Sequence, residues 1–201
     1  MGLTQEDAVS LVTQVQQAHR LAVGFYQRIL PALDNLAAHF DTRFWFWEPK
    51  DLSRPCPVKS RPSDSWSWDF TPLVCSRFSY IRSSGSEMQV SDFIIELQLL
   101  IDPAVTREYR GKRGQPDPTA LEDVPPKLRT FLYWPAENSN EDLQEAYDNS
   151  PYPSEAEGQV ENVGSNLLST WFEIPLAVFV HDPQNVVARI AAFAPQTATT
   201  A

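Results

Sequence analysis

The first forty residues place the strongest constraint on the fold, because apolar side chains recur there at steps of three and four. This spacing puts them on one face of a helix and predicts a long amphipathic helix. Thr4 followed by Asp7 is a capping-box-like start. Pro31 predicts a kink or a break, because proline removes one donor and clashes with the carbonyl of Gln27. The apolar positions are Ala8, Leu11, Val12, Val15, Ala18, Ala22, Phe25, Tyr26, Ile29, Leu33, Leu36, Ala37 and Phe40.

The apolar stripe of this helix needs a surface to cover it. Burying one large apolar side chain contributes about 1.5–3 kcal/mol before the entropy cost is counted, and an isolated helix gains none of it. We expect the stripe to pack on a sheet of the same chain. Pairing of two copies into a homodimer is the alternative.

Residues 90–101 alternate in a way that is typical of a β-strand. One face carries apolar side chains from Phe93 to Ile101, and the other carries Asp92, Glu96 and Gln98 between apolar neighbours. This pattern predicts a sheet with one buried and one mostly polar face. A second strand at 73–82, joined by a short Ser/Gly turn, would complete an antiparallel hairpin.

Four further segments favour strands, and one favours a helix. The short runs 43–47 and 130–134 are rich in aromatic residues, which favour strands. Residues 66–70 alternate between apolar and polar side chains and predict a strand or an extended edge segment. Residues 167–180 are apolar on both sides and predict a central strand that is bent at Pro175. Residues 185–193 have helical character. The chain is therefore predicted to be α+β, with a long N-terminal and a short C-terminal helix packed on one face of an about five-stranded, mainly antiparallel sheet. We expect one domain over 1–194, an acidic loop insertion at about 136–162 and a frayed tail at 195–201.

The net charge of −10 is concentrated in one part of the chain. No Lys or Arg lies between Thr130 and Ala188, where ten of the 26 acids lie, so the other 16 acids balance the 16 bases. This acidic segment is either a solvated, partly disordered loop or a surface for a partner protein with a basic surface. The partner-binding candidates in it are Glu141, Asp142, Glu145 and Asp148.

The stretch 43–82 holds four of the six tryptophans together with several basic residues. Exposed tryptophans suit a protein interface, so Trp66 and Trp68 are further partner-binding candidates. The same residues would also fill an aromatic-rich core. A third interpretation is a single-stranded nucleic-acid site, against which the strong negative charge weighs.

An active site, if there is one, is expected on the polar sheet face. Arg77, Asp92, Glu96 and Glu173 would lie on neighbouring strands there, and paired carboxylates with separated pKa values can act as acid and base. A solvated sheet face gives the same pattern. No nucleophile, phosphate-loop or dinucleotide motif accompanies these residues, and the two cysteines and three histidines lack metal-ligand spacing. We therefore expect no metal and no cofactor.

The sequence shows no signal peptide and no membrane-spanning stretch, and two cysteines fit free thiols in a reducing, cytoplasmic compartment. Together these features favour a non-catalytic protein-interaction module, such as an inhibitor, an adaptor or an immunity-type factor. The alternatives are an enzyme of the hydrolase type on the polar sheet face and a single-stranded nucleic-acid binder.

Overall fold

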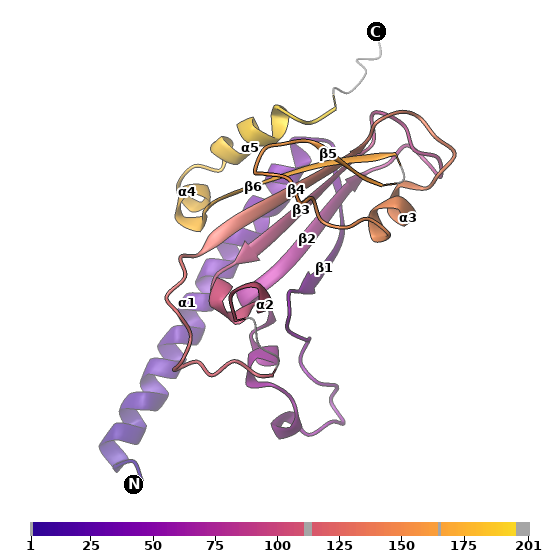
Figure 1. Cartoon of the computed structure of the whole chain (residues 1–201). Coiled ribbons are helices and arrows are strands. Elements are labelled where there is room, and N and C mark those ends of the chain that lie inside the picture. The colour runs from indigo at the N-terminus through magenta and orange to yellow at the C-terminus, as the bar shows by residue number, and fades with distance from the viewer. Residues whose placement is uncertain (1, 111–113, 165, 196–201) are drawn as a thin grey trace. The chain divides into compact units, whose positions relative to one another are not determined.

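The computed structural model describes residues 2–110, 114–164 and 166–195 (Figure 1). The chain divides into two compact units, Met1–Asn35 and Leu36–Ala201. The single domain over 1–194 stays a prediction. From residue 196 onward, the tail that we expected to fray lies outside the described residues.

The predicted N-terminal helix is present as α1, Gln5–Ala38. Its capping box forms: the Thr4 hydroxyl accepts from the Asp7 amide at 3.2 Å, and the Thr4 amide donates to the Asp7 carboxylate at 3.3 Å. Of the kink or break that we expected at Pro31, the break is wrong, because α1 continues through this residue to Ala38, and the kink stays a prediction. A proline frees one carbonyl, and the cooperative helix on both sides tolerates that single loss.

Six antiparallel strands form one sheet in the order β1-β2-β3-β4-β6-β5 (Figure 1). The sequence predicted about five strands, and the additional one is β5. This strand has four residues and mostly exposed side chains, so it carries little apolar pattern. The strands are β1 Arg43–Pro49, β2 Cys75–Arg82, β3 Phe93–Leu100, β4 Lys127–Pro135, β5 Glu161–Gly164 and β6 Leu167–Pro175.

One face of the sheet is apolar, as the alternation in β3 predicted. Phe93, Ile95, Leu97 and Leu99 point to it and are fully buried. Two short helices follow β6 at the C-terminal end of the described chain. The first, α4, spans Leu176–His181 and contacts β4 and β6. The second, α5, spans Gln184–Ala191 and contacts α4. Arg189 of α5 places its guanidinium 4.3 Å from the ring centre of Phe172, which shares the apolar face.

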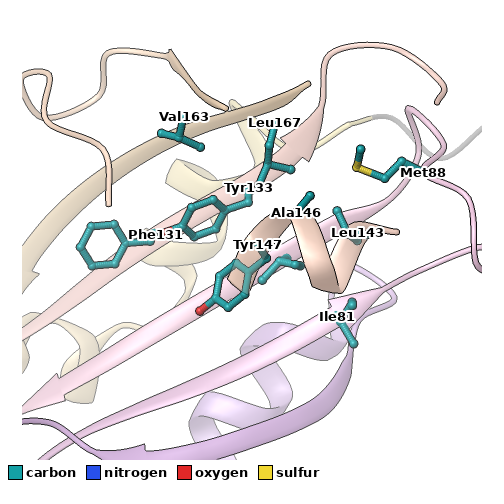
Figure 2. Close-up of a cluster of buried hydrophobic side chains, with 10 residues drawn as sticks. Ile81, Met88, Phe131, Tyr133, Leu143, Ala146, Tyr147, Val163 and Leu167 are labelled. Atoms are coloured by element: carbon teal, nitrogen blue, oxygen red, sulfur yellow. The ribbon is translucent and has the colours of Figure 1, made fainter. Parts of the chain in front are cut away.

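The opposite face is covered at its centre, so the alternative of a solvated polar face is wrong for β3. Toward the edges of the sheet, Glu48 and Glu173 keep part of their exposure. All eight residues of β3 are buried, including those whose side chains point to the polar face. The cover comes from the acidic segment, which forms α3, Leu143–Asp148, and returns to the sheet as β5. Figure 2 shows Leu143, Ala146 and Tyr147 of α3 in a cluster with side chains of the sheet. In its described part, the acidic segment therefore forms regular elements and contributes side chains to the core.

Two of the predicted strand segments fold differently. Ser67–Phe70 is a short 3-10 helix, because alternation alone does not supply the partner strand that a ladder needs. The strand expected over 167–180 ends at Pro175, and the next six residues form α4. Proline cannot donate to a ladder, and its fixed φ suits the start of a helix. Among the described helices, none is long and apolar enough to cross a membrane.

Candidate functional site

The register of the sheet aligns a row of polar side chains on the face covered by α3. Glu48 of β1 pairs with Arg77 of β2, Arg77 with Gln98 of β3, Gln98 with Arg129 of β4, and Arg129 with Glu173 of β6. Residues directly opposite each other on neighbouring strands have Cβ atoms about 4.5–5.5 Å apart. The row therefore crosses five strands, and four of its five side chains are charged.

Glu96 lies on the same face of β3 and is the centre of a buried polar network. Its side chain is 0% exposed and accepts from Gln98 Nε2 at 2.7 Å, Tyr152 Oη at 2.9 Å, Arg77 Nη1 at 3.3 Å and Tyr147 Oη. A carboxylate offers about four lone-pair positions, and four donors fill them. The buried charge is thus both paired and fully hydrogen-bonded.

Both phenols in this network come from the acidic segment, Tyr147 from α3 and Tyr152 from the loop after it. Burial and the adjacent Glu96 charge raise the pKa of each tyrosine well above its ordinary value. They remain protonated donors at neutral pH. Arg77 completes the arrangement by donating from Nε to Glu48 at 2.7 Å. These bonds fasten the acidic segment to the sheet.

A second network lies toward the β6 side of the same face. Lys127 Nζ is 2.8 Å from Glu173, and Arg129 bonds Glu173 at 3.0 Å and both oxygens of Glu108 at 2.8 Å. Glu108 belongs to α2, Arg107–Arg110. The hydrogen bond and charge of Arg129 lower the pKa of Glu108, while at Glu173 the basic neighbours outweigh burial and lower its pKa as well. Both carboxylates are held in their ionised form.

The four residues proposed for catalysis do not form one site. Arg77 and Glu96 meet in the first network, and Glu173 belongs to the second. Asp92 lies elsewhere, because β3 begins at Phe93 and Asp92 is part of the preceding turn. It is fully buried and accepts from the amide and hydroxyl of Ser84 and from the amide of Gln89, at 2.7–2.9 Å. Its role in this geometry is to close the turn.

The four acidic residues proposed for partner binding divide into two groups. Asp142 is the N-cap of α3 and accepts from the amides of Gln144 and Glu145 at 2.9 and 3.0 Å. Glu141, Glu145 and Asp148 are exposed, and in the described parts of the chain no ion pair involves them. We refer to these three exposed carboxylates as the acidic face.

The two tryptophans proposed for partner binding do not share the acidic face. Trp68 packs against a small cluster that includes Cys75 and Val105, and its indole donates to the carbonyl of Pro116 at 2.8 Å. This is a structural position. Trp66 is half-buried and caps the 3-10 helix that contains Trp68.

Sequence reasoning missed Tyr147, Tyr152 and Gln98 as members of the site. A signal was present for one of them: Leu143, Ala146 and Tyr147 have the spacing of one apolar helix face. This apolar pattern is short and lies between the acidic residues 141–148, so the high density of carboxylates hides it. The alternation in residues 90–101 placed Gln98 on the polar face beside Glu96, but it did not indicate a role in the site. Nothing local marks Tyr152, because its partner Glu96 is distant in sequence.

Within the described ranges, no group of three or more His, Cys, Asp and Glu side chains has an arrangement that could hold a metal ion. No curated protein and no solved structure matches the sequence. A family model described as PM0109 matches residues 5–193, which is most of the chain. The chain therefore belongs to the PM0109 family.

Proposed function

We propose that this protein is a non-catalytic protein-interaction module that binds a partner with a basic surface through its acidic face. The observation that carries the proposal is that exposed carboxylates lie on a segment that is anchored to the sheet. Glu141, Glu145 and Asp148 are exposed, while Tyr147 between them is bonded to the buried Glu96. Glu145 and Asp148 thus extend from an anchored helix, and Glu141 directly precedes the N-cap of that helix.

Anchoring favours binding because an ordered surface loses little conformational entropy when a partner docks. The absence of Lys and Arg between Thr130 and Ala188 leaves the local potential negative, which steers a basic partner toward this side. A second copy of the chain stays an alternative partner. A cytoplasmic location is part of the proposal, and the free thiols of Cys56 and Cys75 support it.

The enzyme alternative has less support, since a general acid or base needs a position from which it reaches a substrate. Glu96 has no exposed surface, and Glu173 is engaged by Lys127 and Arg129. The nucleic-acid alternative is weakened by the inward position of Trp68 and by the net charge of −10.

The test compares two variants with the same change in charge. The first carries Glu141→Gln, Glu145→Gln and Asp148→Asn. Asp142 is left intact, because its loss would remove the helix cap. The control neutralises three exposed acids outside the segment, with the substitutions Glu6→Gln, Glu122→Gln and Asp123→Asn.

Each protein is immobilised and exposed to lysate of its source cells at low and high salt, and recovered proteins are identified by mass spectrometry. Circular dichroism and urea unfolding establish that both variants are folded. We expect a stoichiometric, salt-released partner on the wild type and on the control, and its loss from the acidic-face variant. Equal recovery on all three proteins would refute the proposed surface.

A further inference from the structure

A cleft of about 310 Å³ opens on the polar sheet face, between the two networks. Gln98 and Phe131 contribute to it from β3 and β4, Trp171 from β6, and Tyr152 from the acidic segment. Pro153, Lys50, which follows β1, and the ion-paired Arg129 and Glu108 complete the lining. The volume is at the lower end of the range typical of small-molecule sites, about 300–1,000 Å³.

Gln98 is one of the lining residues, and its side chain carries a buried hydrogen-bond acceptor that has no partner. Its side-chain amide donates from Nε2 toward Glu96 and Tyr152, so the carbonyl end is turned away from them. That carbonyl oxygen, Oε1, is buried and has no partner among the described residues, although Gln98 is only 1% exposed. A buried acceptor without a partner destabilises the folded protein, because it has lost its hydrogen bonds to water. A ligand with an N–H or O–H group would remove this cost.

Three aromatic rings give the cleft its apolar character. The ring centres of Phe131 and Tyr152 are 4.6 Å apart, and those of Phe131 and Trp171 are 6.3 Å apart, with tilted planes. The hydroxyl of Tyr152 and the indole nitrogen of Trp171 are already bonded, to Glu96 and to the carbonyl of Glu155. The rings therefore offer their faces and edges, which suits a flat apolar body.

Lys50 supplies the positive charge that remains available. Arg129 directs its donors to Glu108 and Glu173, whereas Lys50 Nζ lies 5.8 Å from the ring centre of Tyr152. No ion pair of Lys50 occurs in the ranges that the structure describes. With Lys50 and Arg129 against Glu108, the lining carries one net positive charge. Because Arg129 is already paired with Glu108 and Glu173, Lys50 is the lining cation that an anion can pair with.

We propose that this cleft binds a small aromatic carboxylate that carries a hydroxyl or N–H group on its ring. The ring lies among Phe131, Tyr152 and Trp171, the hydroxyl or N–H donates to Gln98 Oε1, and the carboxylate pairs with Lys50. This site is separate from the acidic face, so the two proposals stand or fall independently.

The test uses the 2-, 3- and 4-hydroxybenzoate ions as probes, because the isomers place the donor at different distances from the carboxylate. Benzoate lacks the ring donor, and phenol lacks the carboxylate. Binding to the full chain is followed by NMR through the indole N–H signal of Trp171, which is assigned by loss of that signal in Trp171→Phe. The protein variants are Lys50→Gln and, as a matched control, Lys59→Gln, which neutralises an exposed lysine in the loop after β1.

We expect at least one isomer to bind, with benzoate and phenol each about tenfold weaker, the equivalent of one lost hydrogen bond or ion pair. Lys50→Gln should lower the affinity for the best isomer about tenfold, and added salt should also lower this affinity. Lys59→Gln should leave the affinity unchanged, and neither lysine substitution should alter partner recovery by the acidic face.

Three results would overturn the proposal. The first is no shift of the Trp171 signal with any isomer at about 10 mM, a concentration that detects even millimolar affinity. The second is binding of benzoate as tight as that of the best isomer, which would remove the role of Gln98. The third is an unchanged affinity in Lys50→Gln, which would remove the role of the cation.

Discussion

The hydroxyl of Tyr147 offers the sharpest test of how the acidic segment is held. In the variant Tyr147→Phe the ring stays and only the oxygen that donates to Glu96 is lost. Tyr147 is 7% exposed and Glu96 is 0% exposed, so water does not reach the place of the lost hydroxyl. A hydrogen bond to a charged group contributes about 1.5–3 kcal/mol, and we expect the free energy of unfolding to fall by about 2 kcal/mol.

Tyr152→Phe is the matched comparison, because it removes the other tyrosine hydroxyl that donates to the Glu96 carboxylate. The residue is 43% exposed, so water has access to its side and can restore part of the bonding. We expect a smaller loss, about 1 kcal/mol. Because both phenols donate to one group, the double variant should deviate from the sum of the single variants.

The assay is urea unfolding followed by tryptophan fluorescence and circular dichroism. A loss of about 2 kcal/mol should lower the urea midpoint by about 1 M without a change in slope. Hydrogen exchange of the α3 amides, residues 143–148, should accelerate more in Tyr147→Phe than exchange in β3, since the anchored segment opens first. A cost for Tyr147→Phe equal to or below that of Tyr152→Phe would refute the buried anchor.

Three further predictions concern other parts of the structure. Ion pairs lower the pKa of Glu108 and Glu173 in the folded protein, so as the pH falls the unfolded chain binds protons at these residues first. The contribution of these ion pairs to the free energy of unfolding should be fully present above the ordinary Glu pKa of about 4.3 and should decline below it. A urea midpoint that stays unchanged between about pH 5.5 and 3.5 would contradict this prediction. Asp142→Ala should lower the free energy of unfolding by about 1 kcal/mol through loss of the helix cap, whereas Asp142→Asn should retain most of it in the same assay. Burial raises the pKa of the Cys75 thiol to about 12, so a thiol reagent at about pH 8 should label Cys56 in the folded protein and Cys75 only after unfolding; rapid labelling of both would contradict the buried position.

The sequence by itself determined the elements whose pattern is local. The apolar spacing of residues 8–40 and the Thr4 and Asp7 cap specified α1, and the alternation in residues 90–101 specified β3 and its apolar face. These features depend on neighbours within a few positions, and the periods of helix and strand are fixed by backbone geometry. The α+β class and the segregation of charge follow from the same kind of information.

Only the tertiary structure decided what covers the polar face and which groups meet there. The two phenols that bond Glu96 lie 51 and 56 positions after it in the chain. Contacts over such distances depend on strand register and on the path of the connecting loops, and neither leaves a periodic trace in the sequence. The acidic residues gave a clear charge signal, yet the same segment contributes Leu143, Ala146 and Tyr147 to the core. Net charge reports the average of a segment, whereas the fold depends on which individual side chains face inward.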